Sequence, residues 1–200
     1  MAARLVVLAM LLIVATAKAQ AGFAPQEQDS ARYVELRSRI AAGDTTVDFT
    51  ELRVIAARRP SPLGIGSSPA EHLALARDAP DSLVARAHVD SVIWLYFGHV
   101  RAHVDAKRIF EERHDTTRSL SEAAIVRGFI ASIGANGGLT ATTAMPVVSI
   151  DEEYAYLAAH HVHREMQALS KCGTGKCDVL TGVEESTGQI VTYYFLLTWQ

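Results

Sequence analysis

The sequence predicts an α+β fold in which a mostly helical N-terminal part, with one helix hairpin, packs on a small antiparallel sheet with one helix. Apolar residues recur at spacings of three and four through most of residues 31–134, as in amphipathic helices. Beyond residue 160 the chain has segments rich in Tyr, Phe and Val that are bounded by glycines, as in strands. We expect residues 31–134 and the small α+β region at 135–200 to form one continuous domain.

The first 19 residues have the features of a signal peptide. Arg4 supplies a positive start, Leu5 to Val14 form an apolar run, and Ala17-Lys18-Ala19 fits the small-x-small cleavage pattern. A membrane-spanning helix needs about 20 apolar residues, so we favour cleavage after Ala19 over a retained anchor. The expected location is therefore the periplasm or the extracellular space.

The charge balance excludes two classes of partner. The chain has 19 Lys and Arg against 22 Asp and Glu, and removing Arg4 and Lys18 leaves 17 against 22, a net charge of −5. Such a chain offers no basic surface to nucleic acid or anionic lipid. No second apolar run is long enough to span a membrane, so we expect no membrane span after signal cleavage.

The front of the mature chain predicts a flexible arm over residues 20–30 and then short helices. A helix at 31–42 carries Tyr33, Leu36 and Ile40 on one face and ends at Gly43. Asp48 and Glu51 form a capping box that starts the next helix, which ends before Pro60. Residues 60–68 are rich in Pro, Gly and Ser and predict a loop.

The middle of the chain predicts the helix hairpin. A short helix at 69–78 precedes a longer one at 80–97, Gly98 marks a break, and a partner helix follows at 99–113. Such a pair is TPR-like, of the kind found in helical-repeat proteins, but a single pair does not support a repeat array.

Two further capping boxes are predicted downstream. Ser119 and Glu122 would start a helix that ends at the glycine-rich residues 134–138. After the apolar run at 145–150, Ser149 and Glu152 would cap a second helix, and this accounts for the acidic triplet Asp151-Glu152-Glu153 as a favourable helix start.

The C-terminal region predicts three strands, at 161–171, 177–184 and 189–199, with a hairpin turn around Gly188. Cys172 and Cys177 lie five residues apart in an exported chain, so a structural disulfide is the preferred interpretation over free thiols or a redox pair. Trp94, Tyr96 and Phe97 on a helix, and the aromatic residues of the strand from Tyr193 to Trp199, could line a ligand cleft, but we interpret them as core packing residues.

Histidines are the best candidates for chemistry. His99 and His103 are four residues apart on a helix, and His161 and His163 with Glu165 share a strand face, so either set could bind a metal. We favour solvated surface positions for both sets and predict no metal, no cofactor and no catalytic residues. No nucleophile elbow or phosphate loop is present in the sequence.

Several stretches together resemble the bacterial family known as domain of unknown function 4919. They are, in order, GDTT, DAKRIFE, RGFIASI, the segment from Gly137 to Leu157 and a final YYF, and the similarity runs from about Arg32 to the C-terminus. The resemblance implies an exported bacterial protein with a helical front and a small sheet, and it implies no functional residue. That family tends to have Gly-Asp-Gly where this chain has Asn136-Gly137-Gly138, so a cation bound through that carboxylate is not expected.

The function that these observations favour is a non-enzymatic exported binding or interaction protein, because helix hairpins offer concave surfaces to partners. Its partner is not identified by the sequence, and an envelope protein is one candidate. The alternatives are a small hydrolase or a metal-binding protein that uses histidines between the helices and the sheet.

Overall fold

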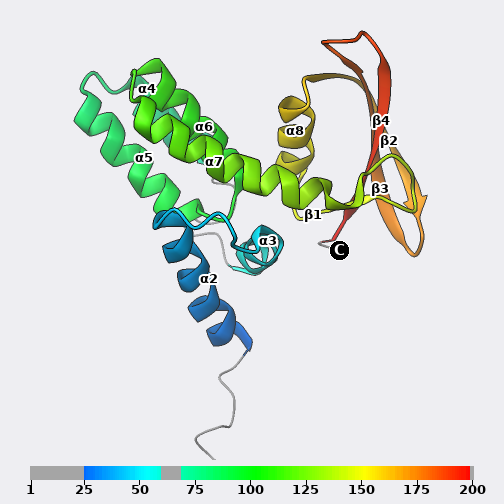
Figure 1. The fold of residues 1–200 in the computed structure, drawn as a ribbon, viewed down its shortest axis with the longest axis horizontal. Coiled ribbons are helices and arrows are strands. Elements are labelled where there is room, and N and C mark those ends of the chain that lie inside the picture. Colours follow the sequence, from blue (N-terminus) through cyan, green and yellow to red (C-terminus); the bar gives the residue numbers. More distant parts are fainter. Residues whose placement is uncertain (1–24, 60–68, 199–200) are drawn as a thin grey trace, which may run out of the picture.

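A computed structural model describes residues 25–59 and 69–198, and Figure 1 shows helices at one side and a sheet at the other. The α+β fold class is confirmed. The elements are α2 (Pro25–Ala41), α3 (Phe49–Arg58), α4 (Pro69–Asp78), α5 (Ser82–Tyr96), α6 (Val100–Glu112), α7 (Thr116–Ile133), η1 (Gly134–Asn136), β1 (Met145–Val147), α8 (Ile150–Ala159), β2 (Val162–Cys172), β3 (Gly175–Glu184) and β4 (Ile190–Leu197).

The chain is helical earlier than expected. The predicted arm over residues 20–30 is wrong for residues 25–30, because α2 begins at Pro25, where proline tolerates the first helical turn. Residues 20–24, the predicted signal peptide and the predicted loop at 60–68 lie outside the described residues. The predicted apolar face of α2 is confirmed, since Tyr33, Leu36 and Ile40 are all buried.

The predicted cap of α3 is half confirmed. The Asp48 side chain accepts a hydrogen bond from the Glu51 backbone N–H at 3.0 Å. The Glu51 carboxylate does not return to Asp48, because it accepts from Arg32 of α2 at 2.9 and 2.7 Å. The second half of the capping box is thus replaced by an ion pair between two helices.

The other two capping boxes are wrong. Helix α7 begins at Thr116, with Asp115 as its cap, and Glu122 is buried against His103. Ser149 is the N-cap residue of α8, as predicted, but its side chain makes no cap hydrogen bond. Glu152 is buried against Arg53 of α3 and also accepts from the Val148 N–H at 2.9 Å. In both cases a partner from a distant part of the chain takes the carboxylate that the local pattern assigned to a helix end.

The predicted hairpin of α5 and α6 is present, and Gly98 lies at its break. A Cβ at Gly98 would lie only 2.2 Å from the Cβ of Ala56, so glycine lets α3 pack closely against this corner. The structure adds two more antiparallel pairs, α4 with α5 and α6 with α7, which pack more extensively than α5 with α6. The helical part is therefore a stack of hairpins rather than a single one.

The sheet is mixed rather than purely antiparallel. Its strand order is β1-β4-β3-β2. The three predicted strands pair antiparallel, and the short β1 joins β4 in parallel, with Met145 opposite Phe195. The parallel pairing of β1 arises because α8 follows β1 in the sequence and carries the chain to the opposite edge of the sheet, where β2 begins.

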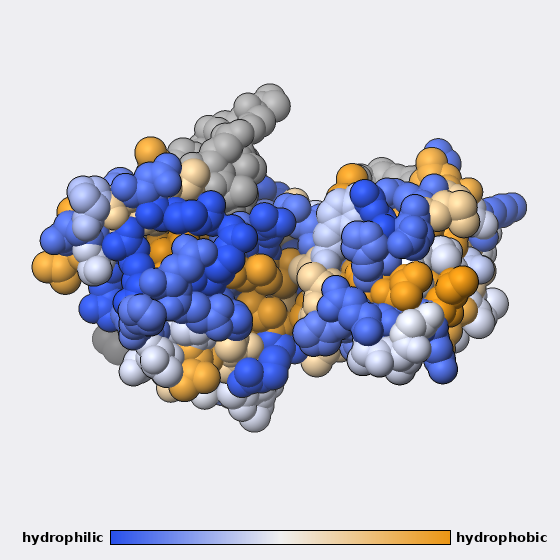
Figure 2. All heavy atoms as spheres, turned by 90° about the horizontal axis from the view of Figure 1, so that it is seen from above, coloured by the Kyte–Doolittle hydropathy of each residue, from blue (hydrophilic) through white to orange (hydrophobic). Residues whose placement is uncertain are grey.

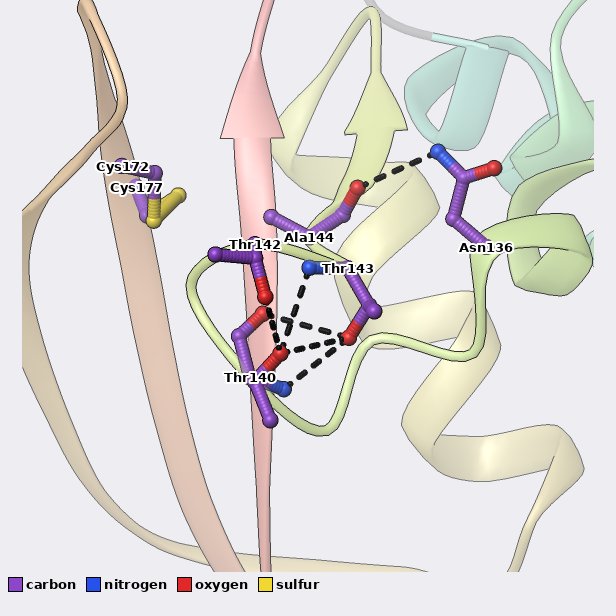
Figure 3. Close-up of a disulfide and its surroundings, with 7 residues drawn as sticks. All are labelled: Asn136, Thr140, Thr142, Thr143, Ala144, Cys172 and Cys177. Carbon is purple, nitrogen blue, oxygen red and sulfur yellow. Dashed lines mark hydrogen bonds between the residues drawn. A yellow bond between two sulfur atoms is a disulfide. The ribbon is translucent and has the colours of Figure 1, made fainter.

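The two faces of the sheet are covered differently. One face packs on α8 and the end of α7 through a core that includes Ile133, Met145, Tyr156, Leu180 and Phe195. On the other face the loop at residues 137–144 crosses beside β4 (Figure 3). The Tyr194 N–H donates to the Gly138 carbonyl of this loop at 2.8 Å. Seen from above, the helices and the sheet form two lobes with apolar side chains exposed between them (Figure 2).

Candidate functional site

A cavity of about 720 Å³ lies in the helical part and is the best candidate for a site. Its walls come from the end of α2 and the turn that follows, the start of α3, the end of α5 and one side of α7. The apolar part of its lining includes Phe49, Ile93, Phe97 and Ile125. Cavities of roughly 300–1,000 Å³ with apolar walls and a few polar groups are typical of small-molecule sites.

One glycine shapes this cavity. Gly128 lies on α7, and a Cβ there would come within 2.3 Å of the Phe49 ring. The absence of a side chain lets that ring pack against the helix, where it also meets Phe129 edge-on with 5.2 Å between the ring centroids. The wall between α3 and α7 therefore depends on glycine at this position.

One polar residue of the lining, Glu122, is paired with a buried histidine, His103, and we call the part of the cavity beside this pair its floor. His103 Nδ1 lies 2.6 Å from Glu122 Oε2, and His103 Nε2 lies 2.7 Å from the Phe97 carbonyl oxygen. His103 is fully buried, and Glu122 is nearly so and lines the cavity. The pair joins α6 to α7 and anchors the end of α5.

The hydrogen bonds of this pair determine its total charge. Because the Phe97 carbonyl can only accept, Nε2 must carry a hydrogen. A second hydrogen must lie between Nδ1 and Glu122, either as imidazolium with carboxylate or as neutral imidazole with carboxylic acid. Both arrangements are neutral overall, so the floor of the cavity contributes no net charge.

The rim of the cavity has three further charged side chains. Arg118 forms an ion pair with Asp90 and lies over the Phe110 ring. Asp44 accepts from the Thr46 hydroxyl and N–H and from Arg39 at 2.8 Å, and these hydrogen bonds lower the pKa of Asp44 to about 2. Arg127, the third, forms no ion pair with any residue in the ranges 25–59 and 69–198.

A second polar cluster lies between α8 and the sheet. Glu153 is 0% exposed, and neither of its oxygens has a hydrogen-bond partner of normal geometry among the described residues. Burial, followed by the neighbouring Asp178 and Glu152 carboxyls, raises the pKa of Glu153 to about 8. Glu153 is therefore protonated at neutral pH, since two adjacent buried carboxylates cannot both stay ionised without a cation.

The Asp178 carboxylate connects this cluster to the surface. It accepts from Gln167 Nε2 at 3.1 Å, and Gln167 Oε1 in turn accepts from the Tyr154 hydroxyl at 3.3 Å. Arg164 Nη1 donates to the same hydroxyl at 2.6 Å. Glu153 itself is completely covered, so its carboxyl group offers no surface on which a ligand could bind.

The third polar group holds the two halves of the chain together. Arg53 of α3 donates to both oxygens of Glu152 of α8, at 2.8 and 2.6 Å, and both side chains are only 2% exposed. Arg53 also donates to the Pro146 carbonyl at 2.7 Å and to Ser132 at 3.2 Å. The pair therefore links α3 to α7, β1 and α8.

The predicted metal candidates lie in separate places. His99 is exposed at the start of α6, whereas His103, which we expected on the surface, is buried with both ring nitrogens engaged. His161 lies in a turn with a φ of 53°. His163 and Glu165 are exposed on β2, and His163 Nε2 lies 3.9 Å from Glu165 Oε1. Across the part of the chain that the structure describes, no three His, Cys, Asp or Glu side chains are grouped to hold a metal ion.

The predicted disulfide between Cys172 and Cys177 is confirmed and joins the facing ends of β2 and β3. Both cysteines are buried with Ala144 from the crossing loop (Figure 3). In that loop the Thr140 hydroxyl forms hydrogen bonds with the hydroxyl groups of Thr142 and Thr143. The bridge thus belongs to the packing of the loop on the sheet.

Sequence reasoning missed Arg53, Glu122 and Glu153. Arg53 lies next to Leu52 and two residues before Ile55 on the buried face of α3, and a charged residue at such a position is a signal of a buried partner. Glu122 and Glu153 gave no such signal, because acidic residues near a predicted helix start already had a local explanation.

No family model matches the chain, and neither a curated protein nor a solved structure is significantly similar to it. Within residues 25–59 and 69–198, none of the helices is both long enough and apolar enough to cross a membrane.

Proposed function

We propose that this protein is an exported, non-enzymatic binding protein that takes a small, largely apolar molecule in the cavity between α2, α3, α5 and α7. The observation that carries the proposal is the cavity itself, about 720 Å³ with Phe49, Phe97 and Ile125 in its walls. An apolar molecule that leaves water for such a site gains roughly 25 cal/mol for each Å² of apolar surface that it buries.

The polar groups of the cavity support binding rather than catalysis. Both ring nitrogens of His103 are already engaged in hydrogen bonds, so the histidine has no free lone pair with which to take a proton from a substrate. At the junction between the helices and the sheet, where a hydrolase site was the alternative, Arg53 and Glu152 are buried and bound to each other. Both polar groups therefore support the packing of the fold.

Export is part of the proposal. A disulfide between Cys172 and Cys177 is compatible with an oxidising compartment, and so is the predicted signal peptide at residues 1–19. Membership of the domain of unknown function 4919 family, which we infer from sequence motifs, remains a prediction.

The experiment uses N-phenyl-1-naphthylamine, an uncharged fluorescent probe of suitable size. The chain from Gln20 onward is titrated, and we expect saturable binding of one probe per chain. Ala124→Trp places an indole in the cavity from α7 and should abolish binding, while Ala131→Trp, on the exposed part of the same helix, should not. Circular dichroism and melting curves establish that both variants are folded.

The proposal fails if the probe does not bind with saturation. It also fails if Ala124→Trp binds the probe as well as the natural chain does, because the probe then occupies another surface.

A further inference from the structure

We propose that the natural ligand is a monoanion with an apolar body, such as an apolar carboxylic acid, and that Arg127 binds its negative charge. This inference rests on the proposed function, because it specifies the class of molecule that the cavity takes. It is argued from the charges that line the cavity and from their partners.

Each charged side chain in the described lining of the cavity is neutralised by a partner, except one. Glu122 shares its proton with His103, and the two are neutral together. The remaining lining charges are those of Asp44, Arg118 and Arg127.

Partners outside the cavity neutralise two of these three. Asp44 forms an ion pair with Arg39, in which Arg39 Nη2 lies 2.7 Å from Asp44 Oδ2. Arg118 forms an ion pair with Asp90. Arg127 has no such partner in the described part of the chain, and its side chain is exposed at the cavity. The site therefore carries one uncompensated positive charge, which complements one negative charge on a ligand.

The position of Arg127 separates the ligand's charge from the floor. Arg127 and Glu122 are five residues apart on α7, which corresponds to about 7.5 Å along the helix axis. An anion held at Arg127 thus lies at the exposed end, where water can complete its hydration, while the apolar body extends over Ile125 toward Phe97. A guanidinium group suits this role, since it can donate two parallel hydrogen bonds to a carboxylate.

The test compares two probes that share one ring skeleton. 8-Anilinonaphthalene-1-sulfonate is N-phenyl-1-naphthylamine with an added sulfonate, so the ratio of their dissociation constants isolates the contribution of the negative charge. We expect the sulfonate to bind about tenfold more tightly at low salt, as for one partly exposed charged hydrogen bond. That advantage should shrink as the salt concentration rises.

The matched variants are Arg127→Gln and Arg108→Gln. Arg127→Gln should weaken binding of the sulfonate about tenfold and change binding of the uncharged probe less than twofold. Arg108 is an exposed arginine of α6 outside the cavity, and its replacement controls for the loss of one positive charge from the whole chain.

The outcomes separate the two proposals. If the uncharged probe binds in the cavity and the sulfonate binds no more tightly, the anion inference is wrong and the binding function stands. The inference is equally wrong if Arg127→Gln weakens both probes alike. If Ala124→Trp binds both probes as tightly as the natural chain does, the proposed function fails and the inference fails with it.

Discussion

Replacing Glu153 by glutamine should stabilise the protein, and the gain should grow as the pH rises. Glu153 is fully buried beside Asp178, and its pKa is raised from the ordinary 4.5 to about 8. Between these two values the folded chain holds a proton on Glu153 that the unfolded chain has released. Folding must therefore take up this proton, and the contribution of Glu153 to the free energy of unfolding falls as the pH rises from about 4.5 to about 8.

The magnitude follows from the same two values. At 1.36 kcal/mol for each pH unit, a pKa that moves from 4.5 to about 8 corresponds to about 5 kcal/mol. This value is the upper bound of the gain, because water that penetrates beside a buried carboxyl reduces the shift of its pKa. Glutamine keeps the shape of the protonated acid and cannot ionise, so the variant should lack this pH dependence.

The assay is urea unfolding at half-unit steps between pH 4.5 and 9, recorded for the natural chain and for Glu153→Gln. The difference in the free energy of unfolding should be small at pH 4.5, rise with pH to at most about 5 kcal/mol by pH 8 and then level off. Glu185→Gln, at an exposed turn, is the control and should show no such trend. A difference that is independent of pH, or that falls as the pH rises, would refute the assignment of Glu153 as a buried acid.

Two further perturbations test the remaining polar contacts. Arg53→Ala should lower the free energy of unfolding by about 3–5 kcal/mol at pH 7, because it leaves Glu152 buried without its cation. In urea unfolding at pH 7, adding Glu152→Gln to Arg53→Ala should recover part of this loss, and full additivity would show that the two side chains are not coupled. Replacing Cys172 and Cys177 by serine should lower the free energy of unfolding by about 2 kcal/mol, since the bridge closes a short loop. A loss above about 4 kcal/mol in the same assay would mean that the bridge does more than restrict the unfolded chain.

Features that depend on neighbouring residues were predictable from the sequence alone. The buried face of α2, the Asp48 cap of α3, the break at Gly98 and the hairpin between β3 and β4 each follow from residues a few positions apart. Helical periodicity, caps and turns are set by contacts over three or four residues, and a linear pattern contains all of that information.

The Ser-x-x-Glu patterns show where this local information ends. Ser119 with Glu122 and Ser149 with Glu152 satisfy the capping-box rule, yet both carboxyl groups bind partners elsewhere. Glu122 lies 19 residues from His103 and Glu152 lies 99 residues from Arg53. A helix end exposed to water can satisfy its N–H groups with solvent, whereas a buried charged or hydrogen-bonding side chain needs a protein partner, so the buried group takes the carboxyl.

The sequence therefore determined the α+β class, most of the helices and the disulfide, because each depends on patterning or on residues close in the chain. Only the tertiary structure decided that β1 pairs in parallel with β4, that Glu153 is buried beside Asp178, and that Arg127 lines a cavity without an ion-pair partner among the described residues. These features depend on which distant surfaces meet, and on which charges are compensated once they have met. Pairings of that kind are selected by packing of the whole chain and leave no periodic trace in its sequence.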